Sequence, residues 1–226
     1  LTNSQLKAQD RIELGGFVGA SYYMGDLNPG TPFKNSHLAV GAIARYVLND
    51  RWAVKGAYTM GTISGSYPGE GLTYPATSDQ GYAFSRKIND IAAMAEFNFL
   101  SYDHQFLSKT VFTPYIAVGL ATTMYSRYDI ESPSSNGSTV FILSLPFGVG
   151  VKYKLTDWVR IGAEWTLRKT FVDDLDYTGG TTPIDPTDPY GFGTSHTVHN
   201  NDWYSFAGVT LTFNMVHRKT TCKSGF

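Results

Sequence analysis

The chain has 226 residues, of which 16% are charged and 15% aromatic, with 23 glycines and a formal net charge of -1. This charge argues against a nucleic-acid-binding protein, because displacing counterions from phosphates takes a basic excess. One cysteine excludes an internal disulfide framework, and no apolar run reaches the roughly 18 residues of a transmembrane helix.

Apolar and polar residues alternate along most of the chain, which is the periodicity of half-buried β-strands. The pattern is clear from Ile12 to Tyr22, where Glu13 has the opposite parity, and from Trp52 to Met60, where Lys55 does. Eight strands are predicted in this way: 11–24, 36–48, 52–64, 87–100, 111–125, 139–154, 158–172 and 202–213.

Two residues fit this pattern poorly. Trp158 has the parity of the charged residues, so we expect a bulge or a turn at that point. Pro146 lies within the sixth strand and has no N–H to donate to a neighbouring strand. We therefore expect a bulge or a break in pairing close to Pro146.

Long and short connections alternate along the chain. The long ones are 25–35, 65–86, 126–138 and 173–201, whereas the short ones are 49–51, 101–110 and 155–157. In an up-and-down antiparallel barrel successive connections lie at opposite ends, so all long loops share one end. Outer-membrane barrels are built in this way, with short turns in the periplasm.

Alternation alone does not decide which face points inward, and a soluble lipocalin-like barrel would also alternate. The less apolar face is mostly small residues with few charges, which favours a narrow filled lumen. Aromatic residues gather at the strand ends, as in the interfacial girdles of membrane barrels: Tyr22, Tyr46, Trp52, Tyr125, Tyr153, Trp165, Trp203 and Phe213. We therefore predict an all-β, monomeric, eight-stranded antiparallel up-and-down transmembrane β-barrel.

Nine ionisable residues have the parity of the predicted lumen: Glu13, Arg45, Lys55, Asp90, Glu96, Lys152, Arg160, Glu164 and Arg168. Isolated charges are costly in a low-dielectric interior, so we expect a structural network of ion pairs. A proton or ion path is the alternative. Because an eight-stranded barrel is wide enough only for its own side chains, we expect a plugged lumen.

Several sequence blocks resemble the PorG-like outer-membrane barrels of the type IX protein secretion system. The similarity spans about residues 11–213 and is carried by ELGGFVGASYYMGDLNPG, RYVLNDRWAVKGAYTMGTISG, IAAMAEFNFLSY, FTPYIAVGL, LPFGVGVKYKLTDWVRIGAEWTLRKTFVDDLDY and DWYSFAGVTLTF. The resemblance implies a non-enzymatic protein associated with a periplasmic ring of a PorK-like lipoprotein and a PorN-like protein. It implies no catalytic residues and no cofactor.

The termini are expected in the periplasm, with an N-terminal segment 1–10, a barrel 11–213 and a basic tail 214–226. Arg218 and Lys219 precede Cys222 in this tail, and such flanking cations favour the thiolate. A lone cysteine in an oxidising compartment suggests an intermolecular disulfide or a free thiol. Cys222 is thus a candidate for a partner disulfide.

Other candidate contacts lie in the connections. Phe106 and Leu107 in the 101–110 turn would be exposed unless they dock on a partner or on the barrel rim. The loop 173–201 holds several aspartates, which suit either a solvated loop or a calcium site. His196 and His199 in the same loop favour no particular metal geometry, and no metal site is predicted.

The expected function is therefore an outer-membrane anchor that attaches a periplasmic PorK/PorN-like ring to the membrane. A surface barrel for adhesion or ligand binding through the loops 65–86 and 173–201 is the alternative. A membrane-embedded hydrolase or acyltransferase is a third class, although no G-x-S-x-G, H-E-x-x-H or Walker motif occurs.

Overall fold

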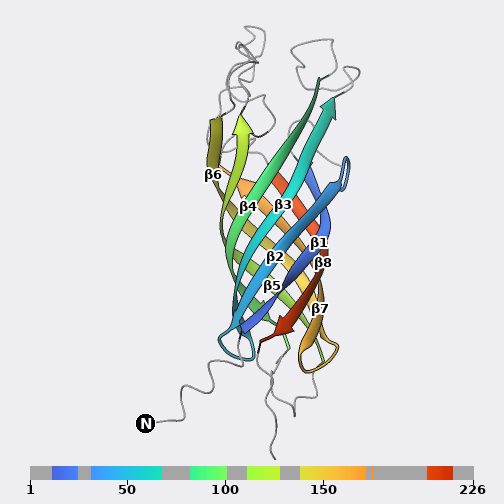
Figure 1. The fold of residues 1–226 in the computed structure, drawn as a ribbon, viewed down its shortest axis with the longest axis vertical. Helices are drawn as coiled ribbons and strands as arrows, with labels where there is room; N and C mark the ends of the chain where they lie inside the picture. The colour runs from blue at the N-terminus through green and yellow to red at the C-terminus, as the bar shows by residue number, and fades with distance from the viewer. Residues whose placement is uncertain are drawn as a thin grey trace, which may run out of the picture.

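The computed structural model describes residues 12–24, 32–67, 82–100, 111–127, 138–171, 175 and 203–215. Within these ranges eight antiparallel strands form one closed barrel, in which each strand pairs with its neighbours in the sequence and β8 closes against β1 (Figure 1). The strands are β1 (Ile12–Met24), β2 (His37–Val47), β3 (Trp52–Tyr67), β4 (Tyr82–Asn98), β5 (Phe112–Arg127), β6 (Ser138–Lys154), β7 (Val159–Thr170) and β8 (Trp203–Asn214). The predicted eight-stranded up-and-down barrel is confirmed.

β4 begins five residues before the predicted boundary and β3 ends three residues after it, because the two strands stay paired as far as Tyr67 and Tyr82. The polarity pattern changes over this stretch, since Arg86 lies on the buried face and Lys87 on the exposed one. The loop predicted at 65–86 is thus confined to 68–81, outside the described residues.

Two short turns lie at the same end of the barrel as the start of β1 and the end of β8. In the β2–β3 turn, the side-chain oxygen of Asn49 accepts hydrogen bonds from the backbone N–H groups of Arg51 and Trp52, at 2.9 Å each. In the β6–β7 turn, Thr156 accepts one from the N–H of Val159 at 3.0 Å. Trp158 belongs to this second turn, which is why its parity differs from that of β7.

Pro146 interrupts one side of the sheet without a bulge. The β5–β6 pairing runs from Phe112 to Val118, stops, and resumes in the same register at Ala121. On its other side Pro146 pairs with Arg168 of β7. The ladder is therefore broken only towards β5, where the missing N–H would have been needed.

Gly119 lies beside this break and is tightly enclosed. A Cβ atom at this position would lie 2.0 Å from the carbonyl oxygen of Ala93 and 2.6 Å from Cα of Met94, both backbone atoms of β4. At Gly56 of β3 the nearest atom would be 3.8 Å away, an ordinary contact.

We expect Gly119→Ala to destabilise the folded barrel by about 1–3 kcal/mol, the usual range for overpacking. Gly56→Ala provides the matched control and should change stability little. The measurement is equilibrium unfolding in urea of both variants reconstituted in lipid vesicles. Equal midpoints for the two variants would contradict the enclosure seen at Gly119.

The outer wall is apolar around the barrel. Val18, Ile91, Val118 and Val209 are each at least half exposed, while Glu13, Asp90 and Glu96 of the same strands are buried. A soluble lipocalin-like barrel would have the reverse arrangement, because its outer face meets water. Among the described residues no helix is long and apolar enough to cross a membrane.

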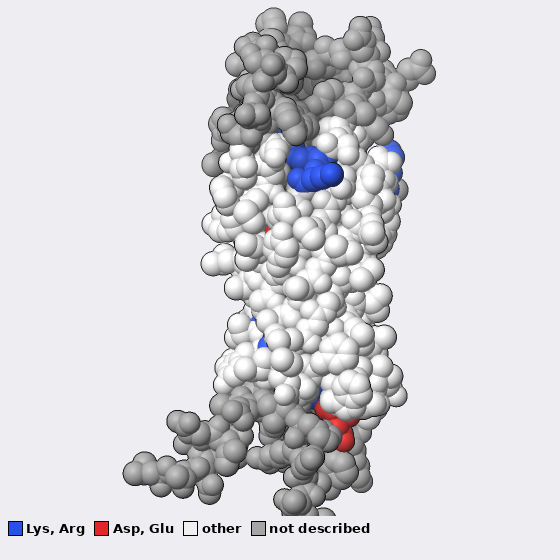
Figure 2. Space-filling view, viewed as in Figure 1, with Lys and Arg blue, Asp and Glu red and all other residues white. Residues whose placement is uncertain are grey.

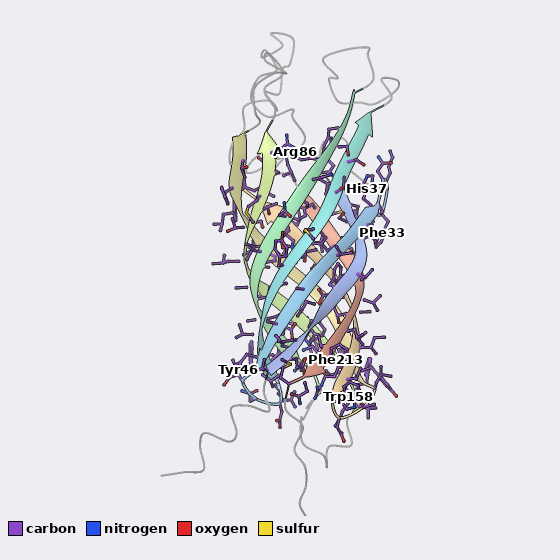
Figure 3. The ribbon with its side chains drawn as sticks, in the orientation of Figure 1. Phe33, His37, Tyr46, Arg86, Trp158 and Phe213 are labelled. Carbon is purple, nitrogen blue, oxygen red and sulfur yellow. The ribbon has the colours of Figure 1, made fainter. Side chains whose placement is uncertain are left out.

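Most of the predicted girdle aromatics lie on this outer wall. Tyr46, Trp52, Tyr153 and Phe213 are exposed at the turn end, where Figure 3 labels Tyr46, Trp158 and Phe213. Tyr22 has the outward parity but is 0% exposed, because the ring of Phe33 packs on it. The predicted outward direction was wrong for Tyr125. Tyr125 is only 2% exposed, with the guanidinium of Arg86 lying 4.3 Å from its ring centroid, because the odd-numbered residues of β5 face inward.

Candidate functional site

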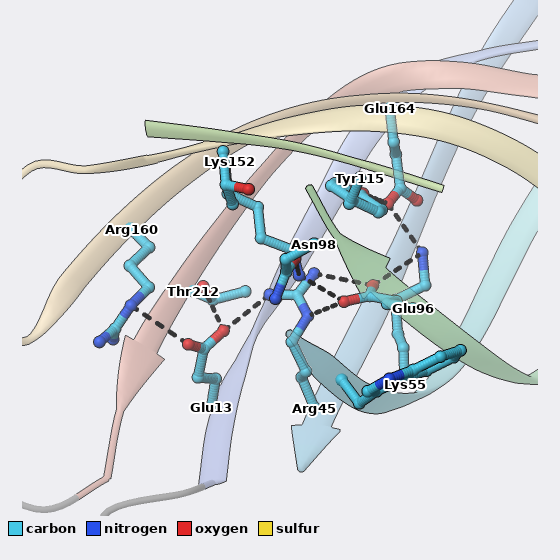
Figure 4. A network of polar contacts seen from close by, with 12 residues as sticks. Glu13, Arg45, Lys55, Glu96, Asn98, Tyr115, Lys152, Arg160, Glu164 and Thr212 are labelled. Carbon is cyan, nitrogen blue, oxygen red and sulfur yellow. Dashed lines mark hydrogen bonds and ion pairs between the residues drawn. The ribbon is translucent and has the colours of Figure 1, made fainter. Parts of the chain in front are cut away.

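The inner face of the barrel holds a network of buried charges centred on Arg45 of β2. Its Nη1 atom lies 2.7 Å from Oε2 of Glu13, and its Nε atom lies 2.7 Å from Oε2 of Glu96 (Figure 4). All three side chains are at most 3% exposed. Glu13 is directly opposite Arg45 in the β1–β2 register, whereas Glu96 reaches it from β4, across the lumen side of β3.

Glu96 is shared by cations from three other strands. Besides Arg45, Lys152 of β6 donates to its Oε2 at 2.6 Å, and Lys55 of β3 lies 3.7 Å from its Oε1. Lys152 also donates to Asn98 at 3.0 Å. One carboxylate thus links β2, β3, β4 and β6.

Glu164 and Glu13 extend the network to the remaining strands. Glu164 of β7 accepts hydrogen bonds from Lys55 at 2.8 Å and from Tyr115 of β5 at 2.7 Å. Glu13 forms an ion pair with Arg160 of β7 at 3.2 Å and accepts a 3.4 Å hydrogen bond from Thr212 of β8. Every strand of the barrel therefore contributes at least one side chain.

A second, smaller group of charges lies nearer the long-loop end. Asp90 of β4 forms an ion pair with Arg168 of β7 at 3.3 Å and accepts a hydrogen bond from Tyr204 of β8 at 2.7 Å. Ala92 and Met94, both buried, separate Asp90 from Glu96 along the inner face of β4. The lumen thus has two polar layers with apolar side chains between them.

The structure places all nine predicted lumen charges on the inner face and brings them together in these two layers. Seven belong to the larger layer, and Asp90 and Arg168 form the smaller one. Arg86 is a tenth inward charge, only 3% exposed, which the sequence prediction missed. The signal was present, because Arg86 shares the parity of Asp90 and Glu96.

The predicted partner contacts lie outside the described residues. This holds for Cys222, Arg218, Lys219, Phe106 and Leu107, and for the loop 173–201 apart from Leu175. Within the described ranges no group of three or more His, Cys, Asp or Glu side chains is arranged to hold a metal ion.

A comparison with protein families matches residues 1–224 of the chain to the family described as "Domain of unknown function (DUF6089)". The chain belongs to the DUF6089 family. No curated protein matches this DUF6089 chain.

Solved structures show which fold this DUF6089 member adopts. Neisserial surface protein A (NspA), from Neisseria, is 12% identical with a TM-score of 0.54, and the match covers 90% of this chain and 96% of that one. The outer membrane protein OprG from Pseudomonas aeruginosa is 13% identical with a TM-score of 0.46, over 92% and 97% of the two chains. Ail of Yersinia pestis, solved with the heparin analogue sucrose octasulfate, is 12% identical with a TM-score of 0.45, over 90% and 96%. The likeness to NspA shows the fold alone, which is that of the eight-stranded outer-membrane barrels.

Proposed function

We propose that this DUF6089 protein is a non-enzymatic outer-membrane anchor of a type IX protein secretion system, which attaches a periplasmic PorK/PorN-like ring to the membrane. The observation that supports the anchoring role is the apolar outer wall around a buried network of charges. The identity of the system and of its partners rests on the resemblance to the PorG-like family.

The width of the apolar wall supports a membrane location. On β4 the outward residues are apolar from Ile91 down to Phe97, and Phe99 continues this belt beyond the strand. A tilted strand needs about 9–11 residues to cross a bilayer, so this stretch is close to the required length. Figure 2 shows a predominantly uncharged wall between the two ends of the molecule.

The narrow lumen supports an anchor rather than a conduit. An eight-stranded barrel has room only for its own side chains, and here the inward positions hold large buried groups such as Arg160, Tyr204, Phe206 and Met94. On this proposal the lumen is plugged and passes no folded protein. Partner attachment then belongs to the ends of the barrel and to the tail.

The arrangement of the chain ends supports attachment in the periplasm. Glu13 near the start of β1 pairs with Asn214 at the end of β8, at the same end as the short turns. Short turns are periplasmic in outer-membrane barrels. The sequence that follows Met215, including Arg218, Lys219 and Cys222, then begins on the periplasmic side.

A pull-down from native membranes in mild detergent tests the proposal. The tagged chain should recover PorK-like and PorN-like proteins, and deletion of residues 216–226 should remove most of that recovery. Deletion of 68–81, at the opposite end, is the control and should leave it intact. Recovery of no periplasmic protein by the intact chain would refute the anchor.

Cys222→Ser separates a disulfide from a non-covalent contact. If Cys222 is bonded to a partner, non-reducing electrophoresis of native membranes should show a heavier band that disappears with this variant or with reductant. A single band at monomer mass in all three samples would exclude the intermolecular disulfide and leave the non-covalent attachment to the deletion experiment.

Adhesion or ligand binding at the cell surface is the second candidate function. It is favoured by the extension of β3 and β4, which run past the apolar belt to Tyr67 and Tyr82 and project beyond the neighbouring strands (Figure 1). This extension would carry the 68–81 connection away from the membrane. If adhesion is the function, deleting 68–81 should abolish cell or matrix binding, while deleting the tail should not.

A further inference from the structure

Among the described residues, three lysines are the positively charged side chains on the outside of the barrel at its long-loop end. They are Lys34 before β2, Lys87 on β4 and Lys169 on β7. Among the described residues no Asp or Glu accompanies them there, because each acid points inward or lies in a turn at the other end. Figure 2 shows two separate groups of basic side chains on the upper part of this face, one near its centre and one at its right edge.

Lys87 and Lys169 lie near the end of the apolar wall on the long-loop side. On β4, Lys87 comes two outward positions beyond Ile91, which is 52% exposed. On β7, Lys169 follows Leu167 on the outward face, and Phe171, which is 53% exposed, comes two residues later. Lys87 therefore stands where the hydrocarbon would end and the lipid head groups would begin, and Lys169 lies among the outermost apolar side chains of the wall.

Lys34 is held against the wall by its neighbour Phe33. The Phe33 ring packs on Tyr22 of β1, with a centroid separation of 4.7 Å, and lies 6.2 Å from the ring of Trp165 of β7. Trp165 in turn donates a 2.8 Å hydrogen bond to the hydroxyl of Tyr22. This packing fixes the segment that carries Lys34 at the border of the apolar belt.

Lys169 is positioned by Trp203 of β8. Its amino group lies 5.5 Å from the centroid of the Trp203 ring, within the range of a cation–π contact. Tryptophan prefers the membrane interface, and a lysine beside it keeps its stem on apolar surface and its charge in the polar layer.

The opposite end of the wall has a different chemistry. Its outward residues are mainly aromatic, and its exposed charges have both signs, with Asp50 beside Arg51. Asp157 is also exposed there and pairs at 3.0 Å with Lys154, whose side chain is 9% exposed. Among the described residues the outer wall is therefore basic at one border and mixed at the other. This asymmetry matches a bilayer whose leaflet on the loop side carries the more anionic head groups.

We propose that Lys34, Lys87 and Lys169 bind the phosphate groups of phosphorylated lipid in the leaflet on the long-loop side. In an outer membrane that lipid is the phosphorylated glycolipid of the outer leaflet. The inference rests on the membrane placement proposed above and not on the secretion partner. Lys87 on β4 and Lys169 on β7 are separated by β5 and β6, so these two lysines contact separate lipids.

Spin-labelled diphosphoryl lipid A, present in trace amounts in phosphatidylcholine vesicles, tests this proposal. Its overall association constant with the folded barrel, relative to labelled phosphatidylcholine, should fall by about a quarter for each of Lys34→Gln, Lys87→Gln and Lys169→Gln, and about fivefold for the triple variant. Arg51→Gln, a cation of the turn end, is the matched control and should leave the constant unchanged.

Dephosphorylated lipid A supplies the second arm and should show no preference over phosphatidylcholine. Equal enrichment of the two lipid A forms, or full enrichment retained in the triple variant, would overturn the proposal. Heat-modifiable migration on gels verifies that each variant is folded. If the barrel folds and recovers its periplasmic partners but shows no phosphate-dependent lipid enrichment, this inference alone is refuted. If the lipid enrichment is intact but no periplasmic partner is recovered, only the secretion assignment is refuted.

Discussion

Replacement of Glu96 by glutamine should destabilise the barrel by about 3–5 kcal/mol, the range found when one member of a buried ion pair is removed. Glu96 is fully buried and lies within 4 Å of the charged groups of Arg45, Lys55 and Lys152. The substitution keeps the shape of the side chain but removes its charge. The four buried cations of the layer would then share its two remaining carboxylates, Glu13 and Glu164.

Urea unfolding of the reconstituted barrel, followed by tryptophan fluorescence, measures this loss. Asp157→Asn is the control, because Asp157 is 56% exposed and pairs only with Lys154. Lys154 is 9% exposed, but the solvent-exposed carboxylate of Asp157 limits its ion pair to about 0–1 kcal/mol. If E96Q is as stable as the Asp157 variant, the lumen network does not stabilise the fold.

Val118→Arg has the second largest expected effect. Val118 is 53% exposed on the outer face of β5, between the exposed residues Ile116 and Leu120. An arginine on the lipid face costs about 2–4 kcal/mol near the bilayer midplane and about 0–1 kcal/mol near the interface. A destabilisation of 2 kcal/mol or more is therefore expected if this wall faces hydrocarbon.

Ser126→Arg is the matched control on the same strand and the same face. Ser126 is exposed at the long-loop end of β5, beyond the apolar belt. The difference between V118R and S126R in vesicle unfolding therefore isolates the depth of the substituted residue. Equal free energies of unfolding for these two variants would contradict a membrane-facing wall.

The number of strands, their order and the direction of their faces could be predicted, because the alternation of apolar and polar residues within each strand indicates them. One parity of β4 contains Asp90 and Glu96, and the other contains Ile91 and Phe97. Errors occurred where the two faces stop differing in polarity, as at Arg86 and Lys87, since both sides of the strand leave the apolar belt there.

The ion pairs were less predictable than the inward direction of their members. Glu96 meets Arg45 and Lys152, which belong to β2 and β6, although the neighbours of β4 in the sheet are β3 and β5. Which charges meet across the lumen depends on the stagger of the strands around the barrel. The alternation of apolar and polar residues along a strand does not reveal this stagger. The Phe33 contact was likewise unpredictable, because it depends on the path of a connection.

The sharing of Glu96 among four strands has a consequence for biogenesis. A lone β3–β4 hairpin entering the bilayer would carry Lys55, Asp90 and Glu96 into hydrocarbon, with Arg45 and Lys152 still absent. Glu13 gains its contacts with Arg160 and Thr212 only when β7 and β8 arrive. Insertion one hairpin at a time would thus pass through states with uncompensated ions, so the strands must close into a cylinder before or while they leave water.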